Sequence, residues 1–437
     1  MKILLNIFAA ATLLAASQAS HAGLPIQTWV TASGARVMFV QADAIPMLDV
    51  QIDFDAGARF DPPGKSGVAQ LTQDLIGKGM PQMDEQQIED RLADLGAQMS
   101  GGASMDRLSH TLRTLTDPAI RTAAIDLFAA ALQTPNFPEA VLAREKTRRI
   151  AALREANTQP DYIAQRRFYA LLYGAHPYAA EPTEQSVLAI TRADIENFYR
   201  QTHSAQRAVV SMIGAISRSE AEAIAEQLTR TLPAADALSP PPAPEATHAQ
   251  VERIAHPAQQ SHILIGMPAI VRGDPDYFAL LVGNHVLGGG GFVSRLMHEV
   301  REKRGLAYSV YSYFAPMKQT GPFIIGLQTQ RTQTDAALQL VHQTLRDFLT
   351  RGPSAAEVKA AQNNLIGGFA LRIDNNHKIL ELLASIGFYQ LPLDYVDRWT
   401  EKIGAVTVAD IRAAFARKVK AEQLVTVVVG TTVTGDK

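Results

Sequence analysis

The sequence predicts an α+β protein built from two homologous domains, each a mixed, mainly antiparallel sheet flanked by helices. Three observations indicate this class: a proline-rich stretch divides the chain, short segments of the two halves repeat at one spacing, and strand-like segments alternate with amphipathic helical ones. A chain of 437 residues, of which 47% are hydrophobic, is also long enough to bury more than one core.

The division between the halves lies at a segment with five prolines between Pro233 and Pro244. Such a segment favours an extended polyproline conformation over a packed helix or strand. We therefore predict a first domain over residues 23–232, a linker over 233–249 and a second domain over 250–437.

Two pairs of segments indicate that the domains are duplicates. TRADI at residues 191–195 returns as TVADI at 407–411, and SAQRAVVSMIG at 204–214 returns as KAEQLVTVVVG at 420–430, both at a distance of 216 residues. A threonine N-cap, a helix and an apolar strand that ends in glycine are thus encoded twice.

Each half begins with strand-like sequence and continues with helices. In the first half we expect strands over residues 36–40 and 48–54, then helices over 67–79 and 138–154. In the second half we expect strands over residues 261–267 and 323–329, and helices over 277–287 and 335–349.

The N-terminus has the features of a secretory signal peptide over residues 1–22. Lys2 is followed by an apolar run over residues 3–16 and by small residues at positions 20 and 22, before Gly23. We predict an exported, periplasmic protein, in which no membrane span remains after signal cleavage.

Charge and cysteine content exclude several classes of function. Forty-one basic and forty-three acidic residues give a net charge of −2, which does not favour a nucleic-acid partner. The sequence has no cysteine, so disulfides, thiolate catalysis and cysteine zinc sites are excluded.

The segment GVAQLTQDLIGKG at residues 67–79 has the outline of a catalytic helix. Gln70, Gln73 and Asp74 are spaced i, i+3 and i+4, which places all three side chains on one face. His298 and Glu299 begin like an HExxH zinc helix, but the second histidine position holds Glu302, so a solvated helix face is the better interpretation.

Two segments carry a resemblance to a known family. GVAQLTQDLIGKG resembles the metal-binding helix of the pitrilysin/insulinase zinc peptidases, in the branch that includes mitochondrial processing peptidase. Residues 287–311, LGGGGFVSRLMHEVREKRGLAYSVY, are similar to the conserved segment of that family's C-terminal domain. With the duplicated halves, the resemblance spans nearly the whole mature chain and implies one half of a metallopeptidase clamshell.

The resemblance also shows where this chain departs from the family. The family's inverted HxxEH motif supplies two zinc-binding histidines and a glutamate base. Laid on this sequence, the histidine positions fall at Gln70 and Asp74 and the base at Gln73. Glutamine is a poor zinc ligand, and its amide cannot act as a base.

The third zinc ligand of the family is a glutamate about 75 residues downstream of the motif. That position falls near residues 150–152, where the closest carboxylates are Glu145 and Glu155. We therefore expect no metal site in this chain, and no peptide hydrolysis by the chain alone.

The resemblance implies that the other half of an active site is kept. An arginine and a tyrosine of the family, which bind the substrate backbone and the developing oxyanion, map onto Arg301 and Tyr308. The alternative is that Arg301 pairs with Glu299 or Glu302 and that Tyr308 is a core aromatic residue.

The glycine run Gly288, Gly289, Gly290 and Gly291 permits two interpretations. The run could be a sharp helix–helix turn with close backbone contacts, or a flexible loop that binds substrate, as the family implies. The sequence alone does not separate the two.

These features give one leading functional hypothesis and two alternatives. The leading hypothesis is the non-zinc subunit of a heterodimeric periplasmic metallopeptidase, whose HxxEH-bearing partner carries zinc and with which it encloses a peptide or unfolded polypeptide. The alternatives are a non-catalytic scaffold, and a homodimeric peptide-binding protein of the same fold.

Overall fold

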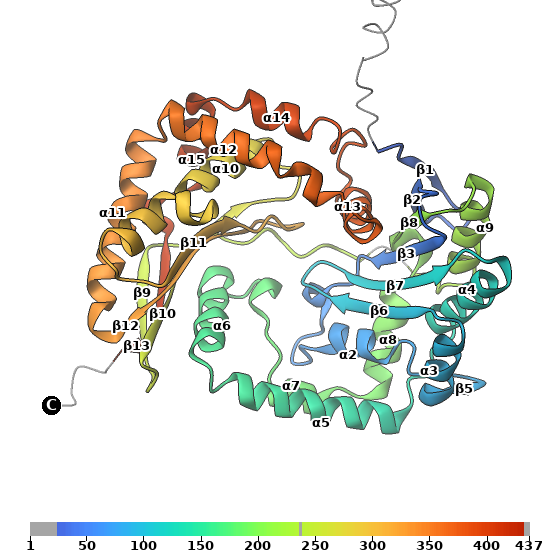
Figure 1. The fold of residues 1–437 in the computed structure, drawn as a ribbon. Coiled ribbons are helices and arrows are strands. Elements are labelled where there is room, and N and C mark those ends of the chain that lie inside the picture. Colours follow the sequence, from blue (N-terminus) through green and yellow to red (C-terminus); the bar gives the residue numbers. More distant parts are fainter. Residues whose placement is uncertain (1–23, 236–237, 432–437) are drawn as a thin grey trace, which may run out of the picture.

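The computed structural model describes residues 24–235 and 238–431. They form one sheet of six strands and one of five, each flanked by helices, which confirms the α+β class (Figure 1). The predicted signal peptide lies outside the described residues. Within them, no helix combines the length and the apolar character needed to cross a membrane.

The first half builds the six-stranded sheet, in the order β1-β2-β8-β3-β7-β6. Only β2 and β8 run parallel, and the other neighbours are antiparallel. The strands are β1 (Gln27–Val30), β2 (Arg36–Gln41), β3 (Met47–Phe54), β6 (Gln98–Ala103), β7 (Leu108–Leu115) and β8 (Ala208–Gly214). The main helices of this half are α2 (Val68–Leu75), α3 (Glu85–Asp94), α4 (Pro118–Gln133), α5 (Glu139–Ala156), α6 (Pro160–Tyr173), α7 (Glu184–Ala189), α8 (Arg192–Thr202) and α9 (Arg218–Thr229).

The second half builds the five-stranded sheet, in the order β11-β12-β10-β13-β9. Again one pair, β13 and β9, is parallel, at the place that β8 and β2 occupy in the first sheet. The strands are β9 (Gln250–Ala255), β10 (Gln260–Ile270), β11 (Ser309–Phe314), β12 (Gly321–Gln330) and β13 (Val425–Thr431). The α-helices are α10 (Tyr277–Asn284), α11 (Thr334–Arg351), α12 (Ala355–Gly367), α13 (Asn376–Tyr389), α14 (Trp399–Ala405) and α15 (Val408–Lys418).

The repeated sequence segments occupy equivalent places in the two halves. Thr191 and Thr407 each form a capping box, in which the threonine hydroxyl accepts a hydrogen bond from the N–H of Asp194 or Asp410 and the aspartate bonds back. Each capped helix leads through a short 3₁₀ turn into a central strand, β8 or β13. The domain boundaries at 23–232 and 250–437 stay a prediction.

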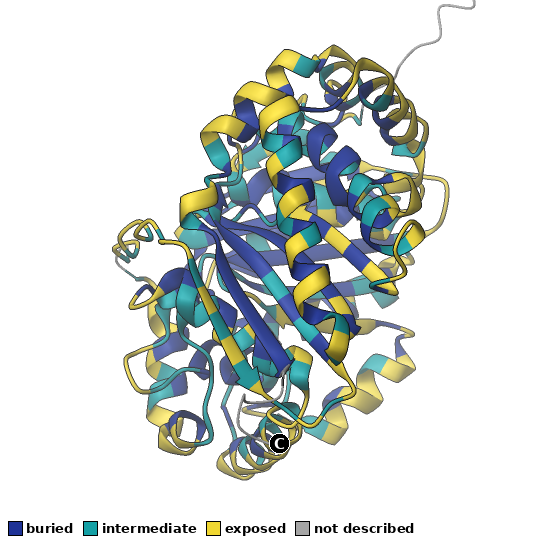
Figure 2. Ribbon diagram, turned by 90° about the vertical axis from the view of Figure 1, so that its left-hand side faces the viewer, coloured by how far each residue is buried: buried dark blue, intermediate teal, exposed yellow. Residues whose placement is uncertain are grey.

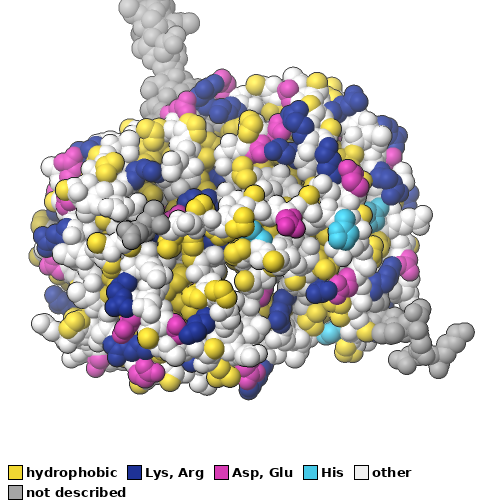
Figure 3. All heavy atoms as spheres, turned by 180° about the vertical axis from the view of Figure 1, so that it is seen from behind, with side chains coloured by type: hydrophobic (Ala, Val, Ile, Leu, Met, Phe, Trp, Pro, Cys, Tyr) yellow, Lys and Arg dark blue, Asp and Glu magenta, His cyan; other side chains and the backbone are white. Residues whose placement is uncertain are grey.

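The extent of burial differs between the sheets and the helices that cover them. In Figure 2 the strands are mainly buried, while the outer helices alternate between buried and exposed residues along their length. On the face shown in Figure 3, Lys and Arg side chains lie interspersed with Asp and Glu. No single sign of charge therefore dominates this face, and the net charge of the chain is −2.

The two halves exchange helices. Helix α13 from the second half packs on β8, β3 and β2 of the first sheet, and α6 from the first half packs on β13 and β10 of the second (Figure 1). Gly387 of α13 lets the helix approach closely, since a Cβ there would lie 2.6 Å from Val209 of β8. Each half therefore completes a hydrophobic core of the other.

A buried carboxylate reinforces this exchange. Asp106 accepts hydrogen bonds from Arg59 Nη1 (2.6 Å) and the Tyr178 hydroxyl (2.6 Å) in the first half. From the second half it accepts bonds from the Lys318 N–H (2.8 Å) and the Tyr389 hydroxyl (3.1 Å). One side chain thus joins four segments from both halves.

Two predicted helices differ from the expected ranges. The helix predicted over residues 67–79 covers only Val68–Leu75, because Ile76 is extended and Gly77 adopts a φ of 82°. The helix predicted over 277–287 is α-helical to Asn284 and π-helical from His285 to Gly289, where Gly288 lies against Ser312 of β11. The first helix therefore ends early at the left-handed Gly77, whereas the second changes from α- to π-helical winding and runs to Gly289.

We expect Asp106→Ala to lower the free energy of unfolding by about 3–5 kcal/mol, because four donors would lose a buried charged acceptor, although Arg59 keeps its pair with Asp55. Urea titration followed by tryptophan fluorescence would measure this change, since Trp29 lies in the first half and Trp399 in the second. Asp335→Ala, which removes only an exposed ion pair with Arg253, should change stability by less than about 1 kcal/mol. Equal effects of the two substitutions would contradict the role given to Asp106.

Candidate functional site

Helix α2 carries the residues at the degenerate zinc motif, and its start is fixed by a partly buried carboxylate. Asp61 accepts hydrogen bonds from the N–H groups of Gly67 (2.6 Å) and Ala69 (2.8 Å). Burial raises the pKa of Asp61 to about 6, although these two bonds act to lower it. Gly67 has a φ of 108°, which only glycine adopts without strain.

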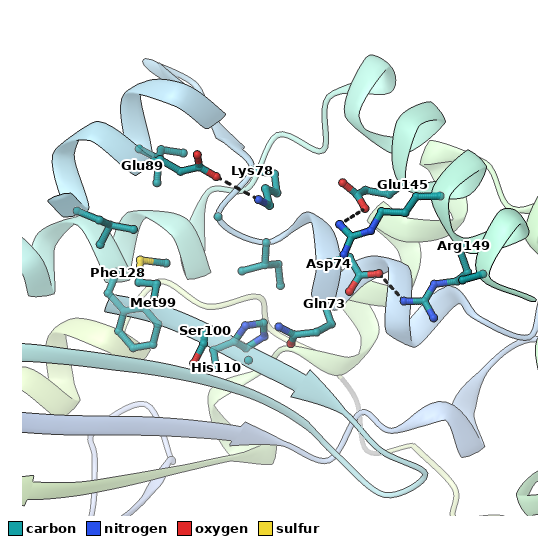
Figure 4. Close-up of a pocket in the computed structure, with 17 residues that line it drawn as sticks. Gln73, Asp74, Lys78, Glu89, Met99, Ser100, His110, Phe128, Glu145 and Arg149 are labelled. Carbon is teal, nitrogen blue, oxygen red and sulfur yellow. Dashed lines mark hydrogen bonds and ion pairs between the residues drawn. The ribbon is translucent and has the colours of Figure 1, made fainter. Parts of the chain in front are cut away.

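Gln70 and Asp74 are joined by a hydrogen bond on the face predicted from their spacing. Gln70 Nε2 donates to Asp74 Oδ1 at 2.9 Å, and Arg149 Nη2 of α5 donates to Asp74 Oδ2 at 2.7 Å. Gln73 is buried against β6, where a Cβ on Gly101 would collide with its amide nitrogen. Figure 4 shows the Asp74–Arg149 pair beside Gln73.

These residues do not fit a zinc ion. The described residues contain no group of three or more His, Cys, Asp or Glu side chains that could hold a metal. Asp74 is the only carboxylate of the three motif positions, and the Arg149 guanidinium already neutralises it. A second cation at this carboxylate would meet direct charge repulsion.

No carboxylate from the predicted third-ligand region, near residues 150–152, is bonded to Asp74 among the described residues. The side chain that reaches Asp74 is Arg149, directly before this region. Glu145, the nearest carboxylate before it, is bonded to Arg144 and Arg148. A guanidinium therefore lies beside the only carboxylate of the motif, and the position of the third ligand stays a prediction.

A cavity of about 440 Å³ lies beside this pair, and its lining includes Gln73, Asp74, His110, Glu145 and Arg149 (Figure 4). His110 is only 3% exposed, and its Nε2 has no hydrogen-bond partner among the described residues. Burial lowers the pKa of His110 to about 3 and lowers that of the neighbouring His203 as well. Both imidazoles are therefore neutral at physiological pH.

Arg301 and Tyr308 lie together at the other candidate site, next to the edge strand β11 of the second sheet. Arg301 is part of a π-helix over Met297–Glu302, and Tyr308 directly precedes β11. The Arg301 guanidinium carbon lies 4.8 Å from the centre of the Tyr308 ring and 4.9 Å from that of Phe292. No hydrogen bond or ion pair among the described residues joins this pair to Gln70, Gln73 or Asp74.

The alternative interpretation of Arg301 and Tyr308 is wrong. Glu299 pairs with Lys303 and Arg304, and Glu302 pairs with His298, so neither glutamate is bonded to Arg301. Tyr308 is 79% exposed and is not a core residue. Tyr308 is therefore presented on the surface, beside the half-buried Arg301.

The glycine run combines close packing with one exposed turn. A Cβ on Gly288 would collide with Ser312, and one on Gly289 or Gly290 would lie 2.5 Å from an atom of Asn284 or His285. Gly291 has a φ of 61° with open space around it. These contacts favour the packed turn for the first three glycines, and substrate contact at Gly288 to Gly291 stays a prediction.

Comparison with known proteins identifies the family. Residues 36–184 match the model described as insulinase (peptidase family M16), and residues 189–365 match the peptidase M16 inactive domain. The chain is also similar to a crystal structure of a peptidase M16 inactive domain from Pseudomonas fluorescens, at 37% identity and a TM-score of 0.90, over 95% of this chain and 100% of that one. This chain belongs to peptidase family M16.

Relatives within family M16 differ in how they are described. A Helicobacter pylori protein described as a non-peptidase homolog is 24% identical over 86% of this chain and 87% of its own length. A probable β subunit of the mitochondrial processing peptidase from Arabidopsis thaliana is 23% identical over 76% and 64%. An uncharacterized zinc protease from Streptomyces coelicolor is 26% identical over 82% and 79%. The residues at the motif place this chain among the inactive M16 members.

Sequence reasoning missed three residues that shape these sites. Arg149 lies directly before the region near residues 150–152 in which a ligand was expected, so a basic residue there was a signal that could have been noticed. Phe292 follows the glycine run, but no sequence pattern brings it onto Arg301. His110 is on β7, and nothing in the sequence shows that it lies beneath Gln73.

We expect that the substitutions Gln70→His, Gln73→Glu and Asp74→His together do not create a zinc site while Arg149 remains. Adding Arg149→Glu should raise the zinc content to about one ion per chain, since a zinc site needs at least three protein ligands. Metal analysis after dialysis against zinc would measure this. Arg148→Glu in place of Arg149→Glu is the matched control, and equal zinc in the two quadruple variants would contradict the role of Arg149.

Buried neutral His110 and His203 also predict acid sensitivity. Between pH 6.5 and about 3 the unfolded His110 binds a proton and the folded one does not, so stability falls as pH falls in this window. Each such histidine contributes a slope of up to about 1.4 kcal/mol per pH unit. Urea unfolding between pH 7 and 4.5 should show a smaller slope for His110→Leu than for the wild type. The exposed His377→Gln should keep the wild-type slope, and an unchanged slope in His110→Leu would refute the account.

Proposed function

We propose that this chain is the non-zinc subunit of a heterodimeric, exported metallopeptidase. It contributes Arg301 and Tyr308 to peptide hydrolysis at the zinc site of an HxxEH-bearing M16 partner. The observation that carries the proposal is that Arg301 is without a carboxylate partner among the described residues, although the neighbouring basic residues His298, Lys303 and Arg304 are each paired with a glutamate.

The chemistry of this pair suits an oxyanion. A guanidinium offers up to five N–H donors and a phenol one more, and both can hold a substrate carbonyl while negative charge develops on it. Tyr308 directly precedes the edge strand β11, whose outer backbone groups can pair with an extended peptide. Binding at this edge would select unfolded or short peptides by their extended conformation.

The metal must then come from the partner. Arg149 and Asp74 close the motif of this chain to a cation, so the partner supplies both the zinc and the water that it activates. In this proposal the two chains enclose the peptide as a clamshell in the periplasm. The signal peptide predicted over residues 1–22 supports export.

A scaffold or peptide-binding role is the second candidate. It is favoured by the similarity to the H. pylori protein described as a non-peptidase homolog. A scaffold can function without Arg301 and Tyr308. The proposed subunit needs both side chains, because they bind the substrate. Substitution of these two residues therefore separates the candidates.

We expect peptide hydrolysis in a mixture of this chain with an exported HxxEH-bearing M16 subunit of the same organism, and little from either chain alone. Arg301→Ala and Tyr308→Phe should each lower kcat of the mixture by about 100-fold, the effect of losing one oxyanion donor. Hydrolysis of a quenched fluorescent peptide, with zinc assayed in each chain, is the measurement.

The matched control for Arg301→Ala is Arg304→Ala, which removes a nearby arginine that pairs with Glu299. It should leave kcat unchanged. If the HxxEH subunit is equally active alone, or if Arg301→Ala behaves like Arg304→Ala, the scaffold role takes the place of the proposed one.

A further inference from the structure

The Arg301 side chain has no polar anchor within the described part of the chain. No hydrogen bond or ion pair is formed by its guanidinium there, while the neighbouring Lys303 and Arg304 are both held by Glu299. A long, unanchored arginine samples many rotamers, and ordering it on binding has an entropic cost. Something other than a carboxylate must restrict this side chain if it is to bind a carbonyl efficiently.

Two aromatic rings provide that restriction. The Arg301 guanidinium carbon lies 4.9 Å from the centre of the Phe292 ring and 4.8 Å from that of Tyr308. Both distances are within the range of a cation–π interaction, in which the face of the ring attracts the cation. Contacts with ring faces leave the N–H donors of the guanidinium free.

Phe292 is an unusual residue to find in this place. It is 64% exposed, and the only cation or aromatic ring that its own ring meets in the described structure is Arg301. A ring that is 64% exposed gains little stability from burial. The contact that it does make is with the Arg301 guanidinium.

The glycine run places Phe292 next to Arg301. Phe292 lies in a 3₁₀ turn over Gly291–Val293, which starts at Gly291 with a φ of 61°. The buried Ser294 closes the turn, since its hydroxyl donates to the Gly291 carbonyl at 2.7 Å. Gly288 fixes the base of the run by close contact with Ser312 of β11, the strand that Tyr308 precedes. The glycine run that precedes Phe292 therefore packs against the strand that begins directly after Tyr308.

We propose that Phe292 is a positioning residue that orients Arg301 for the bound peptide carbonyl. This inference rests on the proposed function, because it assigns a residue to the same site. In this role the glycine run acts by shaping the turn that places Phe292 on Arg301. In this role the aromatic ring of Phe292 orients Arg301 through its face, and an apolar side chain without a ring cannot replace it.

The test uses the mixture of this chain with its HxxEH-bearing partner and a series of substitutions at position 292. Phe292→Leu keeps an apolar side chain but removes the ring, and it should lower kcat/KM by about three- to tenfold. Phe292→Tyr keeps the ring and should retain wild-type activity. Val293→Ala changes the next exposed apolar residue and should have no effect, which makes it the matched control.

A double-mutant cycle separates positioning from a contact of Phe292 with substrate. If Phe292 acts through Arg301, Phe292→Leu should have no further effect in an Arg301→Ala chain. Full additivity, or equal activities of Phe292→Leu and Val293→Ala, would overturn the inference. If Arg301→Ala itself has no effect, the proposed function fails.

A measurement on this chain alone tests the inference independently of any partner. The NMR signals of the Arg301 side chain should be shifted upfield by the ring currents of Phe292 and Tyr308. Phe292→Leu should move these signals downfield, and Val293→Ala should leave them in place. Signals that do not respond to Phe292→Leu would overturn the inference even if the mixture is active.

Discussion

The exchange of helices α6 and α13 is the constraint on which the rest of the structure depends. Each helix covers a sheet that belongs to the other half, so neither half has a complete core by itself. Asp106 lies at this junction and bonds to both halves, including the loop that connects β11 to β12. The half that carries the motif helix α2 and the half that carries the edge strand β11 are thereby packed together, although more than 230 residues separate these two elements in the sequence.

Two arginines of this fold lie in opposite environments, and the contrast supports the proposed function. Arg149 is paired with Asp74, which closes the degenerate motif to metal. Within the described residues, the Arg301 guanidinium contacts two aromatic rings and forms no hydrogen bond or ion pair, so its N–H donors remain available for a ligand. In the proposed function, this difference lets the chain bind and polarise substrate while another chain carries out the metal chemistry.

Local sequence patterns predicted the parts of the fold that local interactions determine. The capping boxes at Thr191 and Thr407 were predictable because an N-cap needs only residues within one helical turn. The shared face of Gln70 and Asp74 follows from helix geometry in the same way. The helix exchange was not predictable, because an amphipathic pattern shows that α6 and α13 have an apolar face but not which sheet that face covers. The contacts of Arg149 and Phe292 were not predictable for the same reason. The first depends on tertiary packing and the second on the conformation of a glycine turn.

The most direct test of the central claim is a competition between two forms of this chain for one HxxEH-bearing partner. The partner and the total amount of this chain are held constant, while the Arg301→Ala form replaces the wild type in steps and peptide hydrolysis is recorded. A shared active site predicts that activity falls in proportion to the Arg301→Ala fraction, because that form still occupies the partner but cannot hold the oxyanion. Activity that stays constant across the series would show that Arg301 takes no part in catalysis and would contradict the account.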